Sequence, residues 1–181
     1  MNLYLDHLVV LGILLLRIFV PLLILKRPLL GGVLAVALDY FDFTILWGMN
    51  SRFLENYQQI DKLLDIHYLS LEALVILNWK NKILKRVLLG LFGYRLVGVF
   101  LFELTKYDYL LFYFPNLFEN LFLLIITYRF LKANFKAKVF QNPLLMRISI
   151  ILAVVFKIYQ ELSLHIIKTS PWIGASILGL K

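Results

Sequence analysis

The chain has 181 residues, of which 61% are hydrophobic and 15% aromatic, and its formal net charge is +8. Its mean hydropathy of +0.82 excludes an ordinary water-soluble domain, because so few polar residues could not cover the surface of a chain this long. The absence of cysteine excludes disulfides, thiolate catalysis and sulfur-ligated metals. The sequence therefore predicts an all-α integral membrane protein.

Six apolar stretches approach or reach the roughly 20 residues that cross about 30 Å of hydrocarbon. In chain order we expect transmembrane helices at about 8–25, 28–49, 62–78, 83–103, 108–131 and 145–167. The loops are too short for a soluble module, so residues 1–181 are expected to form one membrane domain, a polytopic six-helix bundle. The first span is not expected to be a signal peptide, because Asp6 and His7 stand where a basic region would precede it.

Lysine and arginine gather in alternate loops, which carry no acidic residue. Cytoplasmic loops of membrane proteins are enriched in these residues, so we expect both termini on the non-cytoplasmic side of a plasma, inner or thylakoid-like membrane. The same rule accounts for the positive charge, and no nucleic-acid partner is expected. The basic residues of these loops are Lys26, Arg27, Lys80, Lys82, Lys85, Arg86, Arg129, Lys132, Lys136, Lys138 and Arg147.

The longest of these loops, 131–142, places apolar residues near one helical face and lysines elsewhere. This pattern fits a segment that lies on the membrane surface against anionic head groups, and it also fits an ordinary cytoplasmic loop. Membrane lipids are therefore expected partners.

Polar side chains share one face in each of five expected helices. Because buried polar groups in a membrane bundle must face one another or water, these faces are expected to meet in one hydrated chamber on the non-cytoplasmic side. Pro115 is expected to bend the fifth helix. The residues, in chain order, are Asp39, Asp42, Asp61, Asp65, Tyr68, Glu72, Arg95, Glu103, Asp108, Asn116, Glu119, Lys157, Glu161, His165 and Lys168.

Seven carboxylates fall within the expected spans, and only three basic residues lie as deep. A charged side chain at mid-membrane costs about 3 kcal/mol, so seven unpaired carboxylates would cost on the order of 20 kcal/mol, more than the roughly 5–15 kcal/mol that stabilises a typical fold. Arg17, Arg95 and Lys157 could neutralise three of them. Bound cations, protonation or water must meet the remainder.

Carboxylate ligands predict a hard divalent cation, Mg²⁺ or Mn²⁺ and possibly Ca²⁺. A histidine ligand, His67 or His165, would instead admit Zn²⁺. The candidate metal ligands are Asp39, Asp42, Asp61 and Asp65, and the candidate catalytic residues are Asp65 and Glu72 as bases and Arg95 as an anion clamp. The candidate substrate-binding residues are Lys157, Asn116, Glu119, Glu161 and His165. For Arg95 and Lys157, an internal salt bridge is the alternative reading.

The run DYFD at Asp39–Asp42, followed 19 positions later by DKLLD at Asp61–Asp65, resembles the aspartate-rich motif of the CDP-alcohol phosphotransferases. The resemblance implies a six-helix enzyme in which Asp39, Asp42 and Asp61 bind metal and Asp65 activates an incoming alcohol. The family's two glycines and its Ala-Arg pair are replaced by Phe43, Tyr57 and Leu46-Trp47. The resemblance is therefore to a metal-binding helix pair.

Three functions remain open on this basis. The leading hypothesis is a divalent-metal-dependent enzyme that acts on a lipid head group or an isoprenoid-linked substrate. A cation or proton transporter would also use deep carboxylates, although residues 33–37 and 121–126 make the inner halves of two spans apolar. The third is a non-catalytic subunit or assembly factor, with polar faces that bind helices together in a homo-oligomer or a larger membrane complex.

Overall fold

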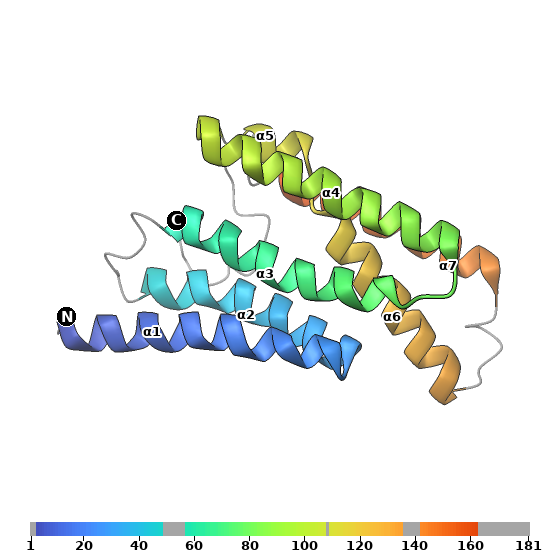
Figure 1. The fold of residues 1–181 in the computed structure, drawn as a ribbon, viewed down its shortest axis with the longest axis horizontal. Helices are drawn as coiled ribbons and strands as arrows, with labels where there is room; N and C mark the ends of the chain where they lie inside the picture. Colours follow the sequence, from blue (N-terminus) through green and yellow to red (C-terminus); the bar gives the residue numbers. More distant parts are fainter. Residues whose placement is uncertain (1–2, 49–56, 108, 136–141, 163–181) are drawn as a thin grey trace. The chain divides into compact units, whose positions relative to one another are not determined.

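The computed structural model describes residues 3–48, 57–107, 109–135 and 142–162. This part of the chain is built of helices and short turns without a β-strand, so the predicted all-α class is confirmed (Figure 1). The helices are α1 (Leu3–Phe19), the 3-10 helix η1 (Val20–Leu25), α2 (Pro28–Gly48), α3 (Tyr57–Leu77), α4 (Lys82–Thr105), α5 (Tyr109–Tyr113), α6 (Leu117–Phe135) and α7 (Pro143–Leu162).

Three helical segments are long and apolar enough to cross a membrane: His7–Leu25, Pro28–Leu46 and Lys82–Thr105. Helices α3, α6 and α7 contain 21, 19 and 20 residues and are not among these apolar segments. The structure thus supports a membrane protein with three strongly apolar spans. A total of six spans remains a prediction.

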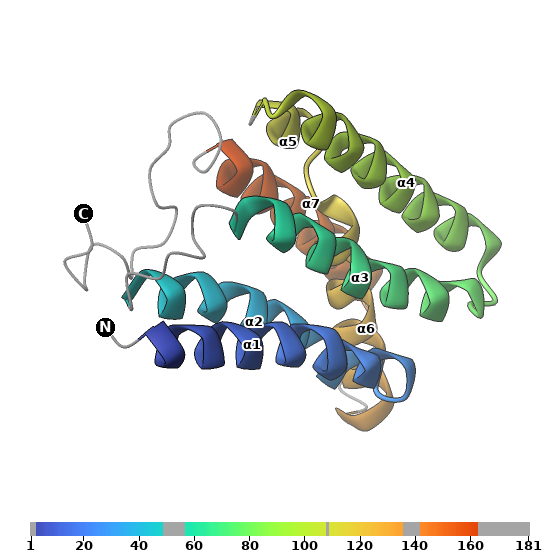
Figure 2. The ribbon, with the colours of Figure 1, turned by 60° about the vertical axis from the view of Figure 1, so that its left-hand side comes forward.

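The chain divides into two compact units, Met1–Leu89 and Gly90–Lys181, and each is described by itself. In the first unit, α1 and η1 run antiparallel to α2, with α3 beside them (Figure 2). Gly31 permits this tight reversal, since a Cβ atom there would lie 2.3 Å from the backbone nitrogen of Ile24. Pro28 begins α2 at a position where its missing N–H is not needed.

In the second unit, the expected single bent helix at 108–131 is instead two helices. Helix α5 ends at Tyr113 and α6 begins at Leu117. The proline between them, Pro115, has no N–H to continue the helical ladder, and its ring disfavours helical geometry at Phe114. The prediction located the irregularity correctly but underestimated it, because a complete break replaces the bend.

Helix α4 holds this break in place. The Tyr94 hydroxyl donates to the Tyr113 carbonyl at 2.5 Å, and the Arg95 guanidinium donates to the Phe114 carbonyl at 2.8 Å. The ring of Phe114 lies against that of Tyr94, with centroids 4.6 Å apart. Gly98 makes room for this packing, because a Cβ atom there would lie 2.2 Å from the Cβ atom of Phe114.

We expect Gly98→Ala to lower the free energy of unfolding by about 1–3 kcal/mol, because the added methyl group displaces Phe114 from α4. Gly93→Ala is the matched control on the same helix, since a Cβ atom there would have nothing within 4 Å. The control should be neutral or up to about 1 kcal/mol more stable, because alanine favours helix over glycine. Thermal unfolding in detergent measures both, and equal melting of the two variants would contradict the packing described.

Candidate functional site

Four aspartates of the first unit surround the guanidinium of one arginine. Arg17 Nη1 donates to Asp42 Oδ2 at 2.5 Å and to Asp61 Oδ1 at 2.7 Å. Its Nη2 donates to Asp39 Oδ1 at 2.5 Å and to Asp65 Oδ1 at 3.0 Å. Arg17 is 3% exposed, so its ion pairs with Asp42, Asp61 and Asp65 are shielded from solvent. We call these five residues, together with Lys62 and Tyr57, the aspartate cluster.

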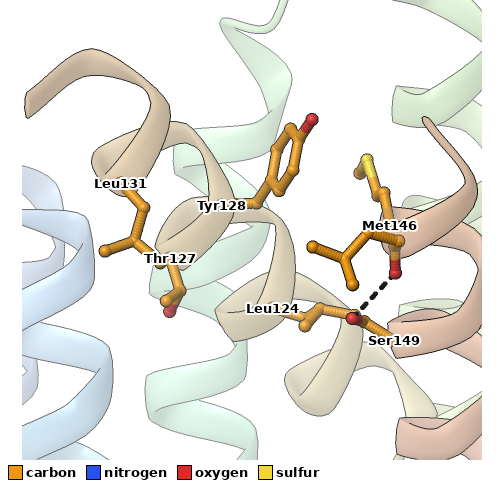
Figure 3. Close-up of a pocket in the computed structure, with 7 residues that line it drawn as sticks. Leu124, Thr127, Tyr128, Leu131, Met146 and Ser149 are labelled. Carbon is orange, nitrogen blue, oxygen red and sulfur yellow. Dashed lines mark hydrogen bonds between the residues drawn. The ribbon is translucent and has the colours of Figure 1, made fainter. Parts of the chain in front are cut away.

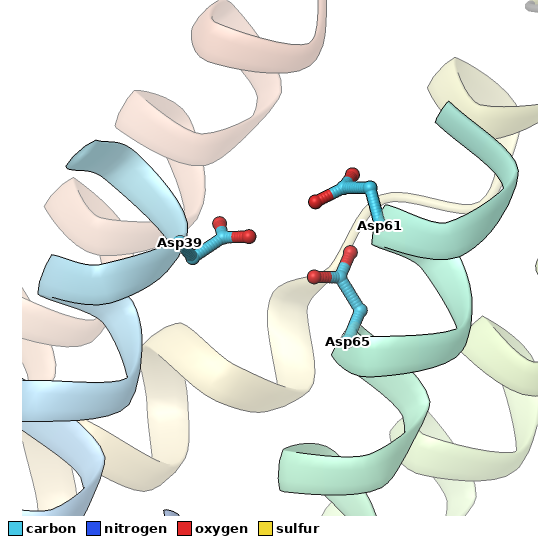
Figure 4. Close-up of side chains that lie close together, drawn as sticks. All are labelled: Asp39, Asp61 and Asp65. Carbon is cyan, nitrogen blue, oxygen red and sulfur yellow. The ribbon is translucent and has the colours of Figure 1, made fainter. Parts of the chain in front are cut away.

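Helical spacing explains why four acidic residues can meet one cation. Asp39 and Asp42 are three residues apart on α2, and Asp61 and Asp65 are four apart on α3, so each pair lies on one face of its helix. The packing of α2 against α3 brings Asp39 close to Asp61 and Asp65 (Figure 4). Arg17 reaches these side chains from the last turn of α1. Three helices therefore contribute to the cluster.

The second oxygens of three of the aspartates also have donors. Lys62 Nζ lies 2.6 Å from Asp61 Oδ2 and 3.0 Å from Asp65 Oδ2, and the Tyr57 hydroxyl donates to Asp42. Asp39 differs, because its side chain is 34% exposed and its Oδ2 accepts no hydrogen bond from the described residues. The aspartate cluster is therefore most accessible at Asp39.

The charges of the aspartate cluster do not balance. Among the described residues, these four carboxylates face two cations, Arg17 and Lys62, so the formal charge with every group ionised is −2. Buried excess charge is costly unless a counter-charge or protons compensate it. A single divalent cation would neutralise the aspartate cluster.

Three of the aspartates are spaced suitably for metal coordination. Ligand oxygens of Asp39, Asp61 and Asp65 all lie within 4.8 Å of one another. Two oxygens on opposite sides of an ion are separated by twice the metal–oxygen distance, about 4.1 Å for Mg²⁺ and about 4.6–5.2 Å for Ca²⁺. The 4.8 Å limit is close to the larger of these separations, and the same three carboxylates also accept hydrogen bonds from Arg17 or Lys62. Asp42, the fourth predicted ligand, lies deeper, between Arg17 and Tyr57.

Glu72, a predicted general base, lies on α3 and is fully buried. It follows Asp65 by seven residues on the same face, which is about 10 Å along the helix axis. That separation leaves Glu72 outside the group of carboxylates that Arg17 joins. Of the two predicted bases, Asp65 alone belongs to the aspartate cluster.

The predicted substrate-binding residues Asn116, Glu119 and Glu161 meet in the second unit, at the start of α6. Asn116 Nδ2 donates to Glu119 Oε2 at 2.5 Å, and the Glu119 N–H lies 3.5 Å from Asn116 Oδ1. The Asn116 N–H donates to Glu161 Oε1, on α7, at 3.3 Å. These are the contacts of a helix cap, with Glu161 completing it from a neighbouring helix.

Two predicted basic residues also belong to the second unit. Lys157 pairs with Glu161 at 3.4 Å on the same helix, which agrees with the salt-bridge alternative. Arg95 donates to the Phe114 carbonyl and makes no ion pair among the described residues. His165 lies outside the described residues. His67 contacts the Ile18 carbonyl at 3.0 Å and is not one of the three candidate ligands.

Sequence reasoning did not assign Arg17, Lys62 or Tyr57 to the site. Arg17 was expected to lie deep in the membrane and to pair with one carboxylate, whereas it pairs with four. Lys62 lies between Asp61 and Asp65 in the sequence DKLLD, and this position could have predicted that it belongs to the site. Tyr57 stands where the CDP-alcohol phosphotransferases have a glycine, and here its hydroxyl bonds a predicted metal ligand.

A separate cavity of about 110 Å³ lies between α6 and α7 (Figure 3). Leucines and Met146 form most of its wall, and its polar groups are those of Thr127, Tyr128 and Ser149. The Ser149 hydroxyl donates to the Leu145 carbonyl at 2.9 Å. With no charged residue in its lining, the cavity suits hydrocarbon better than a charged substrate.

Comparison of the chain with protein-family models, curated proteins and solved structures finds no match. The class defined by fold and site is therefore an all-helical protein with three apolar spans and a buried carboxylate cluster.

Proposed function

We propose that this protein is a six-span membrane enzyme that depends on a divalent cation and acts on a lipid head group or an isoprenoid-linked phosphate. Mg²⁺ or Mn²⁺, or alternatively Ca²⁺, would bind to Asp39, Asp61 and Asp65. The observation that carries the proposal is the excess of four carboxylates over two cations among the described residues of the aspartate cluster, together with three carboxylates within 4.8 Å of one another.

Helix lengths support six spans. Helices α3, α6 and α7 contain 21, 19 and 20 residues, so each extends about 30 Å at 1.5 Å per residue. Their charged residues are largely the partners of the two polar groups already described, which lowers the cost of burying them in a membrane. With the basic residues in alternate loops, six spans give both termini a non-cytoplasmic location.

The roles of the residues follow from their positions. When bound, the cation would polarise a phosphoryl oxygen of the substrate and stabilise the charge that develops on it. Asp39 would present its accessible oxygen at the mouth of the site, and Arg17 would hold the four carboxylates close together despite their repulsion. Asp65 would accept a proton from the attacking hydroxyl.

The resemblance to CDP-alcohol phosphotransferases gives this proposal limited support. It agrees with a pair of helices that bring aspartates together, and the geometry of α2 and α3 meets that requirement. Leu46 is 1% exposed and packs in the core where the family has an Ala-Arg pair. We therefore propose phosphoryl chemistry at a metal centre without assigning a nucleotide substrate.

The proposal predicts that Asp61→Asn abolishes product formation without unfolding the protein. The loss of a metal ligand should lower turnover at least about 100-fold. Cells expressing the wild type, Asp61→Asn or the control Glu103→Gln, which lies outside the aspartate cluster, can be compared by mass spectrometry of total lipid extracts. The wild type and the control should alter the same phospholipid or isoprenoid phosphate, and Asp61→Asn should not. If no lipid differs between wild type and Asp61→Asn while both remain folded, the enzyme assignment is wrong.

A further inference from the structure

Arg95, on α4, is a buried cation whose hydrogen-bonding capacity is largely unused. The residue is 3% exposed, and its one described polar contact is the bond from Nη1 to the Phe114 carbonyl at 2.8 Å. Its Nε–H is buried and has no hydrogen-bond partner. A guanidinium carries five N–H donors, so most of them remain available for a ligand.

The described carboxylates of the second unit, Glu103, Glu119 and Glu161, contact residues other than Arg95. Glu103, two turns further along α4, pairs with Lys106 at 2.5 Å. Glu161 pairs with Lys157 and accepts from the Asn116 N–H, and Glu119 accepts from the Asn116 side chain. No carboxylate of the described residues lies within 4.0 Å of Arg95. Its positive charge therefore has no ion-pair partner within 4.0 Å among the described residues.

A buried guanidinium without a counter-charge is unfavourable in a membrane protein, and a bound anion removes that penalty. The planar fork formed by Nε and Nη2 matches two oxygens of a tetrahedral oxyanion. Phe114, whose carbonyl accepts from Arg95, lies at the break between α5 and α6.

We propose that Arg95, at the break between α5 and α6, binds a phosphate group. Four exposed tyrosines on α4, α5 and the segment between them favour a lipid phosphate as the ligand. Tyr94, Tyr107, Tyr109 and Tyr113 are 43–67% exposed. Tyrosines gather at the level of the lipid head groups, where lipid phosphates are abundant. The site belongs to the second unit and does not depend on the metal site proposed above.

The test is a titration of the full-length protein in detergent with phosphatidylglycerol, with diacylglycerol, which lacks the phosphate, and with inorganic phosphate. Native mass spectrometry and the melting temperature report binding. The wild type should bind phosphatidylglycerol at least about tenfold more tightly than diacylglycerol, and Arg95→Gln should lose this preference. Stabilisation of the wild type by inorganic phosphate would show that the free anion suffices, and binding of the phospholipid alone would show that the acyl chains are also needed; both results support the site.

Arg95→Lys keeps the charge but loses the planar fork, so it should bind phosphatidylglycerol with intermediate affinity. If Arg95→Gln does not fold, Arg95→Lys is the variant that tests the proposal. Lys106→Gln changes an exposed cation on the segment that follows α4 and should bind as the wild type does. Equal affinity of the wild type for phosphatidylglycerol and diacylglycerol would overturn the proposal. So would equal phosphatidylglycerol affinity in the wild type and both Arg95 variants.

Discussion

Arg17→Met is expected to lower the free energy of unfolding by at least about 3–5 kcal/mol, the largest effect of any single substitution considered. Arg17 donates to four aspartates, and its loss leaves their carboxylates with Lys62 as the remaining cation among the described contacts. Removing one partner of a buried ion pair typically costs this amount, because the other charge stays buried. Thermal or denaturant unfolding in detergent micelles measures the loss.

Two further variants make this expectation specific. Lys106→Met breaks an ion pair whose partners are 49% and 31% exposed, and exposed pairs contribute at most about 1 kcal/mol. Adding Asp42→Asn to Arg17→Met removes one of the uncompensated charges, so the double variant should be more stable than Arg17→Met alone. A melting temperature for Arg17→Met close to that of Lys106→Met would show that Arg17 is not the centre of the aspartate cluster.

Much of the aspartate cluster could be predicted from the sequence, because helical spacing determines which side chains share a face. The spacings within Asp39–Asp42 and Asp61–Asp65 required each pair to lie together, and the cost of buried charge required the pairs to find partners. The fourfold role of Arg17 could not be predicted in this way. It depends on how α1 and η1 pack against α2, and therefore on the close approach that Gly31 permits.

The contacts of Asn116, Glu119 and Glu161 at the start of α6 could be predicted only in part. Asn116 and Glu119 stand three residues apart just after Pro115, which is the pattern of a helix start. That pattern predicts both the break and the cap, and a capping role is an alternative to substrate binding for these two residues. The part taken by Glu161 could not be predicted, because it comes from a helix more than 40 residues away and depends on tertiary packing. The single hydrated chamber remains a prediction.

The second expected result concerns the affinity for divalent cations, which depends on the charge of the aspartate cluster. Lys62→Met removes the ammonium from Asp61 and Asp65, which changes the formal charge from −2 to −3. At an effective dielectric constant near 20, a unit charge about 4 Å away contributes about 4 kcal/mol, so even a strongly screened effect should tighten Mn²⁺ binding at least about tenfold. Electron paramagnetic resonance of Mn²⁺ in the purified protein measures the affinity, with Lys106→Met as the control.

The most direct test is the metal content of the purified, folded protein, measured by inductively coupled plasma mass spectrometry for the wild type and for Asp39→Asn/Asp61→Asn. We expect about one divalent ion per wild-type chain and none in the variant, because the substitutions remove two of the three clustered ligands and two negative charges. A wild-type protein that is folded and stays metal-free even after incubation with Mg²⁺, Mn²⁺ or Ca²⁺ would contradict the account.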